Sequence, residues 1–89
     1  MAIKKELEII NQRGLHARAA SKLVNVVKKY KSAVTVSKSD QKVTGSSILG
    51  LMMLAAGLGD KITFEVMGED EQESFEAIKM LVNNKFDED

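Results

Sequence analysis

The chain has 89 residues, 44% of them hydrophobic, which is enough for one compact domain spanning residues 1–89 and too few for two. It contains no cysteine, so it can form neither a disulfide framework nor a thiolate metal site, as is typical of a reducing compartment. No apolar run has the length of a membrane span, and the N-terminus lacks the layout of a secretory signal. These features predict a cytoplasmic protein without membrane insertion.

The formal net charge is zero, but the charges are unevenly distributed along the chain. Residues 1–44 contain ten basic and three acidic residues, whereas residues 45–89 contain three basic and ten acidic ones. An excess of positive charge near a docking face attracts acidic partners. It also raises the hypothesis of a small nucleic-acid binder, which would bind with a strong salt dependence. Aromatic residues make up only 4% of the chain, which disfavours base stacking, so we expect no nucleic-acid partner.

The N-terminal half alternates between strand and helix patterns. Residues 3–9 alternate apolar and polar side chains, which predicts a strand, and a polar break follows at 11–14. Over residues 17–30 the apolar positions fall at helical spacing, with basic side chains on the opposite side, so an amphipathic helix is predicted. Two short alternating runs separated by turn residues predict a hairpin over 33–44.

The C-terminal half predicts two further helices and one further strand. The next helix is expected to begin at Ser46 or Ser47 and to end by Gly57, because serine caps helix starts and glycine often ends helices. Alternation over residues 62–66 predicts a fourth strand. Apolar residues at helical spacing predict a last helix over roughly 70–84, with acidic residues in its first turn, where the helix dipole favours them.

The predicted elements therefore follow the order βαββαβα. Each predicted strand has one apolar and one polar face, which favours an antiparallel sheet covered by helices on one side. We expect an α+β fold, an open-faced β-sandwich in which three helices cover one face of a four-stranded antiparallel sheet. Tyr30 and Phe75 are predicted to be aromatic residues of the core or its edge, and the acidic end FDED a solvated tail.

The single histidine, His16, lies directly before the predicted first helix, where backbone amides such as those of Ala17 and Ala19 lack helical partners. The dipole at a helix start disfavours the imidazolium, which leaves a neutral, nucleophilic imidazole, and it stabilises negative charge on the ring nitrogen. Gly14 permits a backbone conformation that a side chain would forbid. Arg18 can bind two oxygens of an anion at once.

A phosphoryl group held covalently on the histidine would use all of these features. Imidazole is a competent nucleophile for phosphoryl groups, and a site made of hydrogen-bond donors without a metal would hold the product and leave it reactive. A surface or capping histidine is the simpler alternative for a small domain. A metal site is disfavoured, since one histidine without cysteines or acidic neighbours in the sequence offers too few ligands.

The segments GLHARAASKLV, GSSILGLMMLAAGLGDKITF and GEDE together closely resemble the HPr family of histidine phosphocarriers of the bacterial phosphoenolpyruvate-dependent phosphotransferase system. The resemblance covers almost the whole chain and implies the same βαββαβα order. It implies that His16 accepts phosphate on Nδ1 from phosphorylated enzyme I and passes it to an enzyme IIA, and that Arg18 supports the phosphate. It also implies a phosphocarrier without a cofactor, not an enzyme, and we expect a monomer.

One position departs from the family motif. Many members carry proline after the arginine, where this chain has Ala19. Alanine adds an N–H donor and some backbone freedom, so the departure bears on the fine tuning of phosphohistidine stability and not on the basic chemistry. The segments LGLMMLAAG and FDED resemble the nitrogen-related, NPr-like branch of the family more than the sugar-transport branch.

Residues 48–56 contain no polar side chain, although a helix at the surface of so small a domain should have a polar face. Apolar runs usually lie in a core, but here some apolar surface is expected to remain exposed. Met52 and Met53 are adjacent and cannot face the same way, so at least one is expected to belong to an adaptable surface. In HPr-like proteins this helix docks enzyme I and the IIA partners. The docking residues are predicted to be Ala20, Ile48, Leu49, Leu51 and Met52.

Ser47 aligns with the serine that an HPr kinase/phosphorylase modifies in some members of the family, and Ser46 is the alternative. A doubly negative phosphate beside an apolar docking face would repel an acidic partner. Either serine can instead serve only as a helix cap. A different function also stays open, namely a non-catalytic regulatory module that binds partners through the same apolar face. Such a module would keep its effect after His16→Ala.

Overall fold

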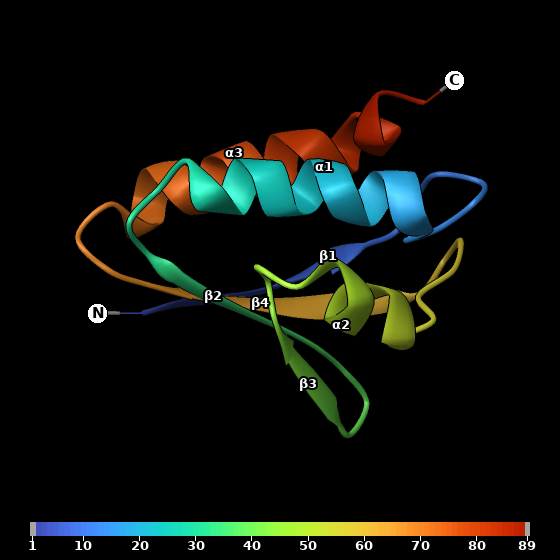
Figure 1. Ribbon diagram of the computed structural model, residues 1–89, viewed down its shortest axis with the longest axis horizontal. Coiled ribbons are helices and arrows are strands. Elements are labelled where there is room, and N and C mark those ends of the chain that lie inside the picture. Colours follow the sequence, from blue (N-terminus) through green and yellow to red (C-terminus); the bar gives the residue numbers. More distant parts are fainter. Residues whose placement is uncertain (1, 89) are drawn as a thin grey trace.

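The computed structural model describes residues 2–88, and the predicted order βαββαβα is confirmed (Figure 1). None of the helices in this range is both long and apolar enough to cross a membrane. A short left-handed turn, η1, follows the last helix. The elements are β1 (Ile3–Glu8), α1 (Ala17–Lys28), β2 (Ala33–Lys38), β3 (Gln41–Thr44), α2 (Ile48–Met53), β4 (Lys61–Met67), α3 (Glu71–Asn83) and η1 (Lys85–Asp87).

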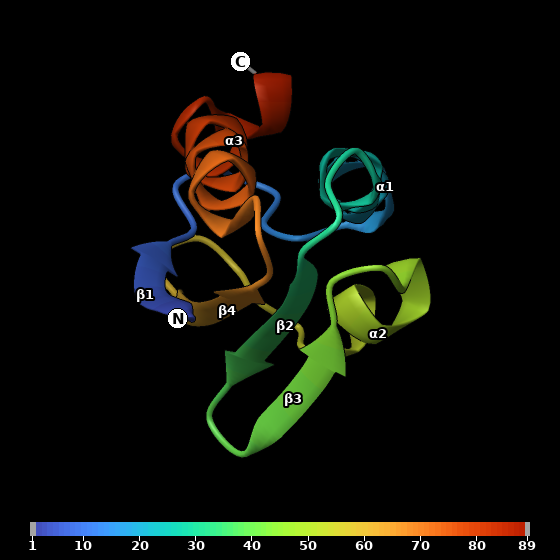
Figure 2. The same cartoon turned by 90° about the vertical axis from the view of Figure 1, so that its left-hand side faces the viewer.

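The four strands form one antiparallel sheet in the order β1-β4-β2-β3. In the register of β4, Val66 lies opposite Ile3 of β1 and Val34 of β2, so apolar side chains line up on one face of the sheet. Figure 2 shows α1 and α3 across this face and α2 beside α1, next to β3. The predicted α+β open-faced sandwich, with its helices on one face, is therefore confirmed.

One hydrophobic core joins this face of the sheet to the helices. Phe75 is buried and Tyr30 half-buried, as predicted for core and core-edge aromatics. The strands contribute apolar side chains to this core because their residues alternate, so that every second side chain points towards the helices. The buried apolar side chains include Val34, Val36, Ile62, Phe64 and Val66 of the sheet, Leu23, Val24 and Val27 of α1, Leu51 of α2, and Phe75, Ile78 and Val82 of α3.

The helices begin close to the predicted positions. Ser47 is the N-cap of α2, and its Oγ accepts a hydrogen bond of 2.9 Å from the backbone N–H of Gly50. The helix was predicted to end by Gly57, and α2 ends earlier, at Met53, after six residues. The next residues cannot continue it, since Ala55 has a φ of +52°.

The prediction of a solvated acidic tail, FDED, holds for the exposed Asp87 and is wrong for Phe86 and Glu88, and Asp89 lies outside the described residues. Phe86, in the middle of η1, is fully buried, and the φ angles of Lys85, Phe86 and Asp87 are all positive. The turn packs on α1 and α3, and Lys22 Nζ of α1 donates a hydrogen bond of 3.1 Å to the backbone oxygen of Phe86. Burial of an aromatic ring stabilises the turn enough to offset its unfavourable backbone conformation. The residue that follows, Glu88, is thereby brought to the start of α1 (Figure 1).

Candidate functional site

His16 is the N-cap of α1, as predicted. Its backbone is extended, with φ −76° and ψ 179°, and its carbonyl oxygen accepts the first helical hydrogen bond from the N–H of Ala20 at 2.8 Å. The amides of residues 17–19, including those of Ala17 and Ala19, come before any helical acceptor and point beyond the helix start. The His16 side chain makes no capping hydrogen bond to them. The positive end of α1 is therefore available to an anion beside the imidazole.

Gly14 sets the path of the loop that presents His16. Its φ is +68°, and a Cβ at this position would lie 2.5 Å from the carbonyl oxygen of Ala56 and 2.8 Å from Cα of Gly57. The next residue, Leu15, donates a backbone hydrogen bond of 2.9 Å to the same oxygen of Ala56. The loop thus lies directly against the segment that follows α2, and only glycine allows this contact.

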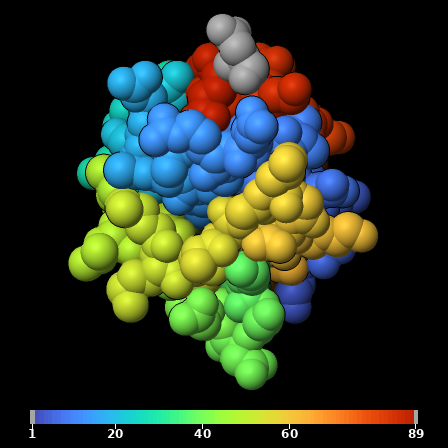
Figure 3. All heavy atoms as spheres, turned by 90° about the vertical axis from the view of Figure 1, so that its right-hand side faces the viewer, coloured from blue at the N-terminus to red at the C-terminus, as the bar shows by residue number. Residues whose placement is uncertain are grey.

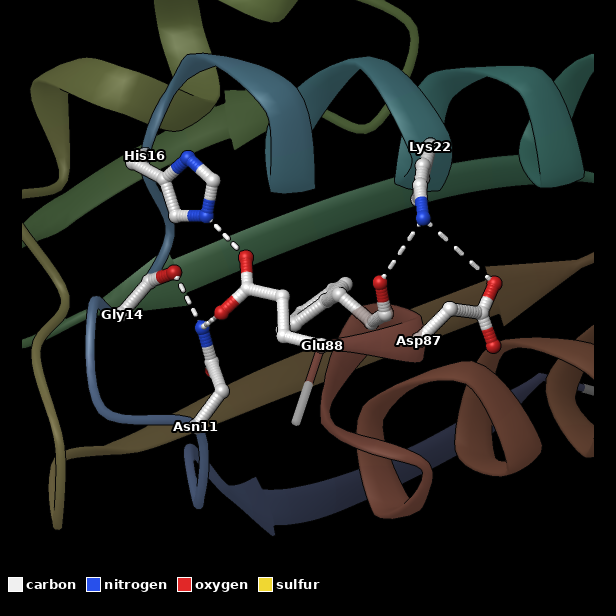
Figure 4. Close-up of polar contacts among 7 residues, drawn as sticks. Asn11, Gly14, His16, Lys22, Asp87 and Glu88 are labelled. Carbon is white, nitrogen blue, oxygen red and sulfur yellow. Dashed lines mark hydrogen bonds and ion pairs between the residues drawn. The ribbon is translucent and has the colours of Figure 1, made fainter.

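A carboxylate from the far end of the chain contacts the ring of His16 (Figure 4). His16 Nε2 forms a hydrogen bond with Glu88 Oε2. The second carboxylate oxygen, Oε1, accepts a hydrogen bond of 3.1 Å from Asn11 Nδ2, which also donates to the carbonyl oxygen of Gly14 at 2.7 Å. The side chain of His16 is 16% exposed, so the ring is partly covered but accessible.

The same contacts determine the charge of Glu88. The hydrogen bond from His16, another from Asn11 and the positive charge of Arg13 outweigh partial burial and hold the pKa of the Glu88 carboxyl below its usual value. The carboxyl is therefore ionised at neutral pH. The sequence motifs point to neither Glu88 nor Asn11, because neither residue belongs to a periodic pattern. The one available signal was the large apolar Phe86 within an otherwise polar end.

Basic side chains surround the site. A shallow depression of about 390 Å³ is lined by Arg13, Arg18 and Lys22 together with Glu88. The structure thus brings the predicted Arg18, which is exposed, to the carboxylate that contacts His16. An exposed guanidinium at this place can reach an anion bound at the start of α1. No cluster of three or more metal-ligating side chains occurs among residues 2–88.

The predicted docking residues divide into exposed and buried ones. Ile48, Leu49 and Met52 of α2 are exposed. Leu51 and Ala20 are fully buried, so the prediction that these two side chains offer docking surface is wrong. Both side chains belong to the hydrophobic core. Leu51 could not be assigned from the sequence because the all-apolar α2 gives no polar side from which to read its orientation. Met53 and the loop residue Leu58, which are not among the predicted docking residues, are also exposed. The apolar surface therefore consists of Ile48, Leu49, Met52, Met53 and Leu58.

Figure 3 shows where this apolar surface lies. The loop before α1 and the start of α1 (blue) occupy the face between the C-terminal segment (red) and α2 with its following loop (yellow-green). Ser47 caps α2 beside this surface, and Ser46 is exposed, with its Oγ 3.0 Å from Thr44 Oγ1. Histidine, basic side chains and apolar surface therefore share one side of the molecule.

Comparison with known proteins agrees with this geometry. A family model described as "PTS HPr component phosphorylation site" matches residues 3–84. The phosphocarrier protein HPr of Neisseria meningitidis is 48% identical over 97% of both chains, and the phosphocarrier protein NPr of Shewanella violacea is 38% identical over 97% of this chain and 94% of its own. The crystal structure of HPr-C-His from Thermoanaerobacter tengcongensis superposes with a TM-score of 0.93 at 36% identity, covering 98% of each chain.

Fold and relatives together define a small α+β phosphocarrier domain rather than a catalytic enzyme. The chain belongs to the HPr family of the phosphotransferase system, as its sequence motifs predict.

Proposed function

We propose that this chain carries a phosphoryl group on Nδ1 of His16, accepting it from phosphorylated enzyme I and delivering it to an enzyme IIA in the cytoplasm. The observation that carries the proposal is the position of His16 as N-cap of α1, with Nε2 tied to Glu88 and Nδ1 without a hydrogen bond to any of residues 2–88. A nucleophilic nitrogen at the positive end of a helix is suited to hold a phosphoryl group and to release it again.

The transfer needs only groups of this chain and its partners. The Nδ1 lone pair attacks phosphorus, the bond between phosphorus and the donor breaks, and its electron pair leaves with the donor. The amides of residues 17–19 and the guanidinium of Arg18 are placed to stabilise the phosphoryl oxygens. Delivery to the next protein repeats the displacement with His16 as the leaving group. No cofactor enters either step.

Phosphoenolpyruvate and enzyme I provide the test. The unaltered protein is expected to gain one acid-labile phosphoryl group, measured by mass spectrometry of the intact protein, and His16→Ala is expected to gain none. Arg18→Ala is expected to slow labelling, whereas Lys29→Ala, which removes a basic side chain at the other end of α1, is expected to leave it unchanged. Labelling that survives His16→Ala refutes the proposal, and a regulatory effect that survives it favours a binding-only module.

We propose that enzyme I and the enzyme IIA dock on the exposed part of the apolar surface. The support is the exposure of Ile48, Leu49 and Met52 on the side of the molecule that carries His16. Leu49→Asp is expected to weaken binding to both partners, measured by titration calorimetry. Met80→Asp is the matched control, because Met80 on α3 is 68% exposed and Leu49 69%. Equal effects of the two variants would contradict the docking surface.

Two further parts of the proposal concern the type of enzyme IIA that receives the phosphoryl group and the regulation of docking by a serine. Of the sugar and nitrogen-regulatory branches, we propose the nitrogen-regulatory one, because LGLMMLAAG and FDED resemble it. We therefore expect faster transfer to a nitrogen-type than to a sugar-type enzyme IIA. We also expect Ser47→Asp, which imitates phosphorylation by an HPr kinase/phosphorylase, to weaken docking more than Ser46→Asp, since Ser47 adjoins Ile48. The protein is expected to act as a monomer, and light scattering at working concentration checks this.

A further inference from the structure

The C-terminal segment reaches the reactive histidine through one carboxylate. Both oxygens of Glu88 are engaged, Oε2 with His16 Nε2 and Oε1 with Asn11 Nδ2. Asn11 is itself fixed by its hydrogen bond to the carbonyl oxygen of Gly14, and its side chain is buried. Glu88 is therefore held in one position by a chain of contacts that runs through the same loop that presents His16 (Figure 4).

This contact determines which ring nitrogen carries the hydrogen. An ionised carboxylate can only accept hydrogen bonds, so the hydrogen between Glu88 and His16 must come from Nε2. In a neutral imidazole with the hydrogen on Nε2, the lone pair is on Nδ1. Nδ1 makes no hydrogen bond to the described residues, so nothing there competes for the lone pair.

We propose that Glu88 is a positioning residue for phosphoryl transfer: its carboxylate keeps the hydrogen on Nε2 and fixes the ring so that the Nδ1 lone pair faces the phosphoryl group. The inference rests on the proposed function of His16. When the Nδ1–phosphorus bond forms and the bond from phosphorus to the donor breaks, the Nε2 hydrogen stays in place. The ring becomes positively charged, and the adjacent carboxylate stabilises that charge without taking the proton.

The position of Glu88 depends on the anchoring of the tail. Phe86 is fully buried in the turn η1, which packs on α1 and α3. Lys22 Nζ donates a hydrogen bond of 3.1 Å to the backbone oxygen of Phe86 and lies 3.7 Å from Asp87 Oδ2. Glu88 follows two residues after this anchor, so its reach to His16 is set by packed structure. It also lies outside residues 3–84, the range matched by the family model, so the family assignment does not supply this role.

The charged groups that face Glu88 come from three elements. Arg13 lies in the loop before α1, Arg18 and Lys22 lie on α1, and Asp87 precedes Glu88 in η1. Positive charges outnumber the one negative neighbour, which keeps the carboxylate ionised at neutral pH. The acceptor role of Glu88 is therefore present under the conditions in which the transfer would occur.

Nitrogen-15 NMR of the unphosphorylated protein tests the role of Glu88 without any partner. At a pH where the ring is neutral, the unaltered protein is expected to show almost only the Nε2–H tautomer. Glu88→Gln is expected to raise the population of the Nδ1–H tautomer, because an amide can donate as well as accept. Glu73→Gln, the same chemical change at an exposed position of α3, is expected to leave the tautomers as they are.

Transfer kinetics complete the experiment. Labelling by enzyme I is expected to slow by about tenfold to a hundredfold in Glu88→Gln, the usual effect of losing one charge-assisted hydrogen bond, and Glu88→Asp is expected to restore part of it. An unchanged tautomer population in Glu88→Gln overturns the proposal, whatever the rate. If instead the unaltered protein is not labelled on His16, the proposed function fails, while the tautomer result still reports on the contact itself.

Discussion

Replacing Gly14 by alanine tests how the loop before His16 is held in place. Two effects act together. A residue with a side chain at φ +68° costs roughly 1 to 2 kcal/mol. The new Cβ would also lie 2.5 Å and 2.8 Å from backbone atoms of Ala56 and Gly57, so the two segments must separate.

The separation has its own cost. It strains the hydrogen bond from Leu15 to Ala56, worth about 1 kcal/mol, and it disturbs packing at a cost of about 1 to 3 kcal/mol. We therefore expect Gly14→Ala to lower the free energy of unfolding by about 4 kcal/mol. For a domain of this size the midpoint of thermal unfolding should fall by roughly 20 °C.

Gly59→Ala is the matched control in urea and thermal unfolding followed by circular dichroism. Gly59 also has a positive φ, +90°, but nothing lies within 4 Å of the Cβ that alanine would add. Its expected cost is only the backbone term, about 1 kcal/mol. If Gly14→Ala destabilises no more than Gly59→Ala, then the close approach to the segment after α2 does not hold the loop, and our account of how His16 is presented is refuted.

Three further predictions concern other parts of the molecule. Leu51→Ala should lower the free energy of unfolding by about 3 kcal/mol and the exposed Leu49→Ala by less than about 0.5 kcal/mol in urea titrations; equal effects would contradict the orientation of α2. Phe86→Ala should lower the free energy of unfolding by about 3 kcal/mol and also raise the population of the Nδ1–H tautomer of His16, because the tail loses its anchor. An unchanged tautomer population would contradict the dependence of the Glu88 contact on Phe86. The hydrogen bond from Ser32, above all, holds the pKa of the Asp70 carboxyl below its ordinary value of 3.8, so its contribution to stability is fully present above that value and is lost as the pH falls through the lower folded pKa. Urea titrations between pH 7 and pH 2.5 should therefore show that acid lowers the free energy of unfolding less in Asp70→Asn than in the unaltered protein. The same pH profile in both proteins would contradict this role of Asp70.

The sequence predicts most of the fold because the longer strands and helices are long enough to show their period. Alternation in β2 and β4 places Val34, Val36, Ile62, Phe64 and Val66 on the buried face, and helical spacing identifies α1 and α3. The first of these helices ends at Lys28, two residues before the predicted end, since terminal turns carry little periodic signal.

The candidate site was only partly predictable for a physical reason. His16, Gly14 and Arg18 are neighbours in sequence, so a local motif can bring them together. Leu51 was misassigned because a helix without polar residues does not reveal which side faces the core. Glu88 was missed because its position depends on the burial of a side chain two residues earlier, in a left-handed turn that only tertiary contacts stabilise.

Two opposing electrostatic effects meet on the imidazole of His16. In the proposed transfer, the positive end of α1 favours the negative oxygens of the phosphoryl group. The carboxylate of Glu88 acts in the opposite sense and stabilises the ring when bond formation at Nδ1 makes it positive. Because one influence comes from the helix that begins at residue 17 and the other from the far end of the chain, each can be altered without the other. If the proposed function holds, the stability of the phosphorylated form can therefore be tuned at the tail while the first helix and the amides of its first turn stay intact.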